Sequence, residues 1–290
     1  VCQGIASNVN DFVVSVPRPQ GPPMLMRGHA GKDRYGITLS LRVLNQIPLT
    51  LPELGVQNLS FTRLMQERKR DGGLVLVCGP TSSGKSTTLA AMVEEYCREI
   101  GGRAVTLEDP IEYPFNQPYH FVTQREVGVE VPSWEDGIMG ALRERIDLLM
   151  IGELRSADSI RAALQASAAG FFVIASIHVM RIHELPERMA LEFPAEEFES
   201  IRKKLASSLK LVIGQRLLPG LHGTALLYEM LDMDRKAKIA FARGSANEIA
   251  ECCNDASNKA NMNFDRCLQY LLHSGQINQE VFEEWRQQDV

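Results

Sequence analysis

The spacing of hydrophobic residues changes along the chain and predicts two different architectures. From about residue 59, short apolar runs alternate with longer segments whose apolar residues recur at helical spacing. Each short run is followed by polar or charged residues, as at the carboxyl end of a buried strand. The predicted strands are 74–78, 104–107, 148–151 and 172–176. Alternating strands and helices are typical of an α/β fold, a largely parallel sheet with helices on its faces.

Helical spacing is clearest in three segments. The segment 85–99 follows the first strand directly, and 198–212 carries four apolar residues at helical intervals. The segment 264–272 ends shortly before Gly275, a good helix terminator. The last third of the chain is therefore expected to be mainly helical, with one strand.

Before residue 59 the pattern is strand-like. Alternating runs at 11–17, 24–30 and 37–44 are separated by turn-rich sequence. Three short strands without a covering helix do not make an independent core, so we expect residues 1–46 to be the end of a small α+β domain. The chain begins with Val1, from which we expect that an N-terminal part is missing. The proline-containing stretch 47–60 is predicted to be a linker, and 61–290 the α/β domain with a helical C-terminal part.

A complete phosphate-binding motif lies between the first strand and its helix. Glycines allow such a loop to turn its N–H groups toward phosphate oxygens, and the following helix adds the positive end of its dipole. Lys85 is expected to contact the β and γ phosphates, and the Ser86 hydroxyl to bind Mg²⁺. A plain glycine-rich turn would not require lysine and serine at these two places. The predicted nucleotide-binding residues are Gly79, Pro80, Thr81, Ser82, Ser83, Gly84, Lys85, Ser86 and Thr87.

Two carboxylates at strand ends are the candidate catalytic acids. Phosphoryl transfer needs one acidic group near the magnesium ion and one that orients or deprotonates the attacking water. Glu108 follows the strand 104–107 and Glu153 follows 148–151. The alternatives are a solvated acidic loop at 108–112 and, for Glu153, a carboxylate that complements a helix N-terminus. His178 also follows a strand, and is a candidate phosphate sensor only in combination with these groups.

Charge, apolar runs and cysteine spacing argue against nucleic-acid binding, a membrane span and a zinc site. With 31 basic and 36 acidic residues the net charge is −5, so no broad basic surface for nucleic acid is expected. No apolar run approaches the roughly 18 residues that span a bilayer. The six cysteines form no C-x-x-C pair, which argues against a zinc site, and Cys78 and Cys97 are predicted to be small core residues.

With these residues identified, the chain resembles the secretion ATPase family that drives type IV pili, type II secretion and related type IV secretion systems. The resemblance extends from about Asp11 to the last helix and comprises several motifs in order. They are the phosphate loop 79–86, the aspartate box 106–112, the segment 124–128, the Walker B-like segment 141–155, the histidine-box region 170–178, and the segments 193–197, 215–217 and 262–265.

The resemblance implies a RecA-like P-loop ATPase domain joined to a PAS-like N-terminal domain. It implies ATP and Mg²⁺ as ligands, a homo-oligomer of six subunits, and a cytoplasmic location peripheral to the inner membrane, where a platform protein is the partner. Glu108 would be the catalytic glutamate, Glu153 would act around magnesium, and His178 would sense phosphate. Arg27 and Arg42 match arginines that complete the site.

Three positions depart from the family pattern. Phe171 replaces the first histidine of the histidine box, Val179 replaces a threonine, and Ser156 replaces an acidic residue. The favoured function is a motor that hydrolyses ATP to power type IV pilus dynamics or protein secretion. The alternatives are a nucleic-acid translocase on the same scaffold and a regulatory nucleotide-binding protein with little turnover, which the changed histidine box leaves open.

Overall fold

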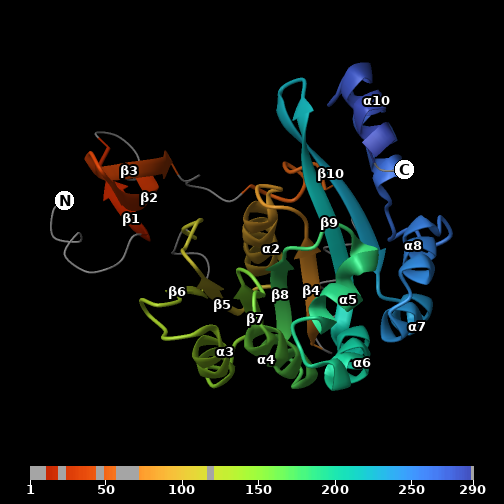
Figure 1. Cartoon of the computed structure of the whole chain (residues 1–290), viewed down its shortest axis with the longest axis horizontal. Coiled ribbons are helices and arrows are strands. Elements are labelled where there is room, and N and C mark those ends of the chain that lie inside the picture. Colours follow the sequence, from red (N-terminus) through yellow and green to blue (C-terminus); the bar gives the residue numbers. More distant parts are fainter. Residues whose placement is uncertain (1–10, 19–23, 44–48, 57–71, 116–120, 289–290) are drawn as a thin grey trace.

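A seven-stranded sheet forms the centre of the molecule. The computed structural model describes residues 11–18, 24–43, 49–56, 72–115 and 121–288. The strand order is β10-β9-β4-β8-β7-β5-β6, and only the edge pair β9 and β10 is antiparallel (Figure 1). The strands are β4 (Gly73–Cys78), β5 (Arg103–Glu108), β6 (Phe121–Glu126), β7 (Leu148–Ile151), β8 (Phe172–Ile177), β9 (Leu209–Gly220) and β10 (Gly223–Asp232).

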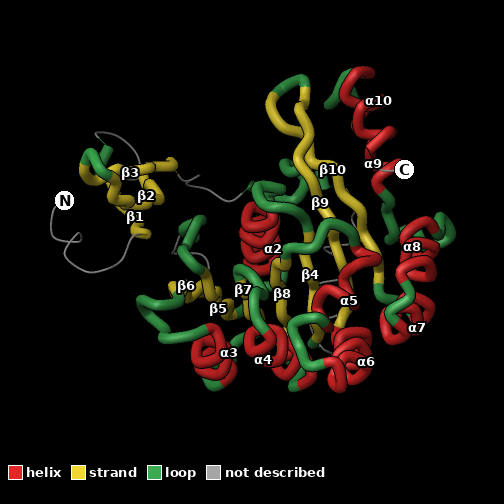
Figure 2. Tube along the Cα trace, viewed as in Figure 1, coloured by secondary structure: helices red, strands yellow, loops and turns green. Residues whose placement is uncertain are grey.

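Helices cover both faces of this sheet. Successive side chains of β4 belong to separate hydrophobic clusters on the two faces of the sheet. Leu74 and Leu76 face one helical layer, whereas Val75 and Val77 face the other. Both layers are buried because parallel strands carry helices on both sides, which gives a three-layer fold (Figure 2).

The two helical layers differ in where their helices come from in the sequence. One layer contains α2 (Lys85–Glu99), α9 (Phe264–His273) and α10 (Gln279–Gln288). The opposite layer contains α3 (Trp134–Leu142), α4 (Ala157–Ala168), α5 (Leu185–Ala190), α6 (Phe198–Ser208), α7 (Arg235–Arg243) and α8 (Ala246–Asn254). Two short 3-10 helices, η1 (Ile182–Glu184) and η2 (Ala195–Glu197), connect parts of this layer.

A separate three-stranded antiparallel sheet precedes the large one. Its strands are β1 (Asp11–Val16), β2 (Met24–Asp33) and β3 (Gly36–Val43), in the order β1-β2-β3. The three strands expected from the alternating pattern are confirmed, and β2 continues three residues further, to Asp33. Every residue of β3 is exposed. The domain boundaries predicted from the sequence stay a prediction.

Residues 49–56, within the predicted linker, pack against the large domain. Leu51 and Val56 are 3% and 4% exposed and belong to the cluster that contains the apolar face of α2. A backbone hydrogen bond from the N–H of Val56 to the carbonyl of Leu51 closes this turn-rich segment. The described part of the stretch is therefore anchored to the core.

The four predicted central strands and the helices 85–99 and 264–272 are confirmed, within one residue at each end. The prediction of a helix over 198–212 is wrong after Ser208. Residues 209–213 read Leu-Lys-Leu-Val-Ile and continue as β9, which pairs with β4 from Leu209 onward. Pairing with a fully buried strand outweighed the helical spacing of Leu209 and Val212, and the expected single strand is a long hairpin.

The cysteine prediction is confirmed: Cys78 and Cys97 are buried and free, and burial raises the pKa of the Cys97 thiol to about 12. Within the part of the chain that the structure describes, no helix has the length and apolar character needed to cross a membrane.

Candidate active site

The phosphate-binding motif forms a tight loop between β4 and α2. Gly84, at the N-cap of α2, has a φ of 87°, and no side chain caps the helix there. The first N–H groups of α2 therefore remain available to an anion. A Cβ at Gly79 would lie 2.4 Å from the carbonyl oxygen of Gln215, so only glycine fits at the start of the loop.

Lys85 is held inside this loop. Its Nζ donates to the carbonyl oxygens of Gly79 at 3.0 Å and Pro80 at 2.8 Å, and lies 3.3 Å from Nδ1 of His178. Burial lowers the pKa of Lys85, and the nearby carboxylates, Glu153 first among them, oppose this shift. The side chain is thus a positioned cation next to the first turn of α2.

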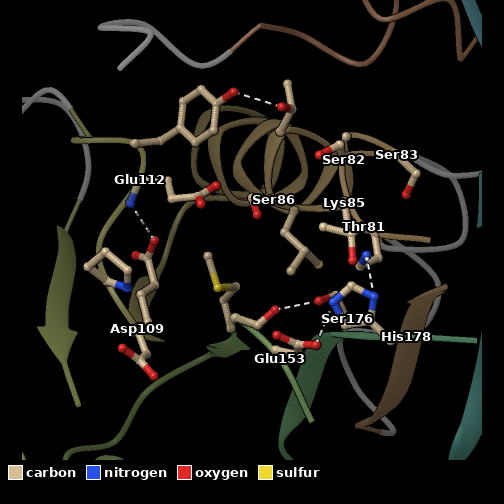
Figure 3. Close-up of a pocket in the computed structure, with 18 of the residues that line it drawn as sticks. Thr81, Ser82, Ser83, Lys85, Ser86, Asp109, Glu112, Glu153, Ser176 and His178 are labelled. Atoms are coloured by element: carbon tan, nitrogen blue, oxygen red, sulfur yellow. Dashed lines mark hydrogen bonds and ion pairs between the residues drawn. The ribbon is translucent and has the colours of Figure 1, made fainter. Parts of the chain in front are cut away.

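Glu153 connects His178 to a second charged pair. Its Oε1 lies 2.8 Å from Nε2 of His178, and its Oε2 accepts a hydrogen bond from Nε of Arg155 at 2.6 Å. Arg155 in turn lies 3.6 Å from Asp109. Glu153 and His178 follow the neighbouring strands β7 and β8, and Figure 3 shows them facing each other below Lys85.

His178 has a lowered pKa. Desolvation is the main cause and the Lys85 charge the second, while Glu153 acts in the opposite direction. A neutral ring fits both contacts, because Nε2–H can donate to Glu153 while Nδ1 accepts from the Lys85 ammonium. The position of His178 between a cation and a carboxylate fixes this tautomer.

Glu108 is a buried carboxylate at the end of β5, only 6% exposed. Its Oε1 accepts hydrogen bonds from the Thr106 hydroxyl at 2.7 Å and the Gln124 amide at 3.1 Å, and its Oε2 accepts from the backbone N–H of Glu112 at 3.3 Å. Burial raises the pKa of Glu108, and the hydrogen bonds of Thr106 and Gln124 partly offset it. A raised pKa makes a carboxylate a better proton acceptor.

These groups line one pocket with a volume of about 530 Å³. Lys85, Glu108, Glu153 and His178 all border it, as does Arg42 at the end of β3. Arg42 is opposite Arg27 in the β2–β3 register. Like charges directly opposite each other on two strands are unfavourable unless an anion lies near them. The side chain of Arg27 lies outside the part that the structure describes.

The remaining loop residues expected to bind nucleotide are distributed around the same pocket. Thr81, Ser82, Ser83, Gly84, Ser86 and Thr87 line it, whereas Gly79 and Pro80 offer their carbonyls to Lys85. Ser82 has a φ of 63°, a left-handed backbone conformation that residues other than glycine rarely adopt.

The three departures from the family pattern each have a structural reason. Phe171 precedes β8 and packs on the core, at the opposite end of that six-residue strand from His178. Val179 is 3% exposed in the same core cluster. Ser156 is the N-cap of α4, where its hydroxyl accepts from the Ser159 N–H at 3.3 Å.

Several contributors to the site were not predicted from the sequence. Thr106 and Gln124 hold Glu108, and Gln124 comes from the edge strand β6, which was not recognised as a strand. Thr87 shares a 2.7 Å hydrogen bond with Tyr113, and the Ser176 hydroxyl donates to the carbonyl of Gly152. Two signals were available: Thr106 lies two residues before Glu108 on the same face of a strand, and Gln124 belongs to the segment 124–128.

The residues present fit a magnesium–nucleotide complex. Mg²⁺ is usually bound through one or two carboxylates, with water and substrate phosphates supplying the other oxygens. Ser86 and Glu153 both line the pocket and supply this kind of donor. Among the described residues no group of three or more His, Cys, Asp or Glu side chains could form an all-protein metal cage.

Comparison with known proteins identifies the family. A family model described as "Type II/IV secretion system protein" matches residues 31–287. The chain belongs to this family. Members with similar sequences include the uncharacterized protein YggR of Escherichia coli K12, 34% identical over 268 residues that cover 92% of this chain and 80% of YggR. The type IV pilus retraction ATPase PilT of Pseudomonas aeruginosa is 31% identical over 255 residues, 88% of this chain and 73% of PilT.

One solved structure supports the same assignment, and a second shares the fold. The pilus retraction motor PilT with bound ADP superposes with a TM-score of 0.81 at 30% identity, covering 94% of this chain and 76% of that one. The ATPase DotB of Legionella pneumophila has a TM-score of 0.79 at 24% identity over 95% of this chain and 76% of its own, a likeness in fold alone. The large domain therefore has the RecA-like fold predicted from the sequence.

Proposed function

We propose that this chain is a motor ATPase subunit that hydrolyses ATP, with Mg²⁺, to drive type IV pilus dynamics or protein secretion. The observation that carries the proposal is the convergence of Lys85, Glu108, Glu153 and His178 on one pocket formed by the phosphate-binding loop. Membership of the secretion-system family and the likeness to PilT, an ATPase by name, support it.

The chemistry begins with the phosphate-binding loop. The loop N–H groups and the first turn of α2 receive the α and β phosphates, and Lys85 exchanges its contacts with the carbonyls of Gly79 and Pro80 for phosphate oxygens. Ser86 and Glu153 are the residues that would hold magnesium, which would supply neutralisation of the phosphate charge.

Glu108 orients and deprotonates the attacking water. The raised pKa suits a general base, and three hydrogen bonds fix the direction of its carboxylate. His178 senses the γ phosphate, because its Nδ1 contacts the same lysine that binds the phosphate. Arg42, and Arg27 opposite it, neutralise charge on the γ phosphate from the small sheet.

Loss of the phosphate charge from the site allows the two parts of the subunit to move relative to each other. Phosphate release removes the partner of Arg42, so the small sheet is free to rotate relative to the large domain. In this proposal six subunits form a ring on the cytoplasmic side of the inner membrane, where a platform protein receives the motion.

The direct test is steady-state phosphate release from ATP by the purified protein, with Mg²⁺ or with a chelator, while light scattering reports the oligomer size. Magnesium-dependent turnover by a six-subunit particle is expected. Tight ATP binding with negligible turnover in an intact ring would instead support a regulatory nucleotide-binding protein. Stimulation by single-stranded DNA that disappears at high salt would support a nucleic-acid translocase.

A further inference from the structure

A buried amide at the start of the segment 215–217, to which no role was assigned from the sequence, contacts the phosphate-binding loop. Gln215 lies on β9 and is 0% exposed. Its Nε2 donates a 2.7 Å hydrogen bond to the carbonyl oxygen of Ser83, which is 132 residues away in the sequence. This is a side-chain contact between β9 and the loop that Figure 3 shows around Ser83 and Lys85.

Strand pairing places Gln215 at this point. Cys78, the last residue of β4, pairs with Gly214 of β9, so Gln215 comes next to the first residue of the loop. A Cβ at Gly79 would lie 2.4 Å from the Gln215 carbonyl oxygen, and one at Gly84 would lie 3.2 Å from the Gln215 amide nitrogen. Backbone and side chain of one residue thus contact both ends of the loop.

The hydrogen bond determines which way one loop peptide faces. The Ser83 carbonyl and the Gly84 N–H belong to the same planar trans peptide and point in opposite directions. With the carbonyl directed at Gln215, the Gly84 N–H is directed away from β9. The peptide lies between Ser82, at a φ of 63°, and Gly84 itself, at 87°. Glycine adopts this left-handed conformation freely, but at Ser82 it is strained and persists only when surrounding contacts fix it.

The oxygen of the Gln215 amide shows that this side chain is not there for stability alone. Oε1 of Gln215 is buried and has no hydrogen-bond partner among the described residues. A buried acceptor without a partner destabilises the fold, and an apolar side chain of the same length would avoid that penalty. Exchanging the two amide atoms would bring Oε1 against the Ser83 carbonyl, so the donor must face the loop.

We propose that Gln215 is a positioning residue for nucleotide binding: its amide holds the Ser83–Gly84 peptide so that the loop N–H groups face the phosphates. Gln215 acts through the loop and does not itself line the pocket. The inference rests on the proposed nucleotide-binding function and extends it to β9.

The test uses Gln215→Met, which keeps the length of the side chain but removes both the donor and the unpartnered acceptor. Its thermal midpoint without nucleotide is expected to equal or exceed that of the unchanged protein. ADP affinity, measured by calorimetry, is expected to fall about tenfold, the loss typical of one hydrogen bond that orients a binding group. Inorganic pyrophosphate, used as a competitor, should lose affinity by the same factor because the effect concerns the phosphate chain.

The matched control is Asn261→Leu. Asn261 is another buried amide, which donates to the Cys252 carbonyl and accepts from the Asp232 N–H, and it does not line the pocket. This change should lower the thermal midpoint and leave ADP affinity within twofold. Gln215→Glu supplies a second variant, in which an oxygen faces the Ser83 carbonyl, and it should weaken ADP more than Gln215→Met does.

Two failures are distinguishable. ADP affinity within twofold of the unchanged protein in Gln215→Met or Gln215→Glu would overturn the positioning role and leave the proposed function intact. Failure of the unchanged protein itself to bind ADP would overturn the proposed function, and the positioning role with it.

Discussion

The Nζ atom of Lys85 lies 3.3 Å from Nδ1 of His178, so the lysine of the phosphate-binding loop directly contacts the candidate phosphate sensor. The other nitrogen of the ring lies 2.8 Å from Glu153. The imidazole of His178 therefore connects Lys85 to Glu153, so a change in the contacts of Lys85 can alter those of Glu153. Three strand ends, those of β4, β7 and β8, are connected in this way.

Replacing Lys85 removes the positioned cation. Lys85→Ala is expected to weaken ATP and ADP binding at least a hundredfold, because the phosphates lose their charged partner in a partly desolvated site. Calorimetric titration measures this loss. Lys204→Ala on α6, an exposed lysine away from the pocket, is the control and should bind normally. Equal affinities in the two variants would contradict the assignment of Lys85.

His178 predicts a pH effect on stability. Its folded pKa is lowered, so the folded state binds the proton less readily than the unfolded state, whose pKa is about 6.5. Above the unfolded pKa, the stability contributed by the neutral ring is fully present. It is lost as pH falls from the unfolded pKa to the lower pKa of the folded state. The drop in thermal midpoint from pH 7.5 to pH 5 should be smaller in His178→Gln than in the unchanged protein.

The control for this effect is His222→Gln, which changes an exposed histidine in the β9–β10 turn. It should leave the pH-dependent drop unchanged. A drop of equal size in His178→Gln and in His222→Gln would show that His178 does not titrate in the predicted way.

Arg42 is expected to act in catalysis rather than in binding. Arg42→Ala should reduce kcat on the order of a thousandfold, the lower end for arginines that neutralise a transferring phosphoryl group, with ATP affinity within about threefold. Steady-state kinetics combined with calorimetry separate the two quantities. Arg34→Ala, in the turn between β2 and β3, changes an arginine of the same sheet that does not line the pocket and should leave kcat unaltered.

The partners of Glu108 set the acid limb of the reaction. The Thr106 hydroxyl donates to the charged carboxylate and thereby lowers its pKa. Thr106→Val removes that donor, so the pKa of Glu108 should rise further and the acid limb of the kcat profile should move to higher pH. Thr123→Val on β6 is the control. An acid limb that does not move in Thr106→Val would argue that another group limits the rate.

The sequence predicted most of what is local in this site. The loop 79–87 could be recognised from its motif. Glu108 at the end of β5 and Glu153 after β7 could be recognised because strands of a parallel sheet end at one edge. The placement of Phe171 at the far end of β8 from His178 could not be recognised, because it depends on where β8 begins and ends.

Contacts between distant segments were not predictable. The helical spacing of 198–212 concealed β9, and with it the pairing of Cys78 with Gly214 that places Gln215 beside the loop. Gln124 was likewise seen as part of a motif but not as the residue that holds Glu108, since that requires β6 to pair with β5. Register between strands far apart in sequence depends on the whole fold.

The most direct test of the central claim compares ATP hydrolysis by Glu108→Gln and Glu112→Gln under saturating ATP and Mg²⁺. Glu108→Gln is expected to lower kcat by about a hundredfold to ten-thousandfold, as for loss of a general base, while keeping ATP affinity. Glu112→Gln changes a neighbouring acid of the same pocket and should retain most of its turnover. Full turnover in Glu108→Gln, with loss in Glu112→Gln, would contradict the assignment of Glu108 as the base.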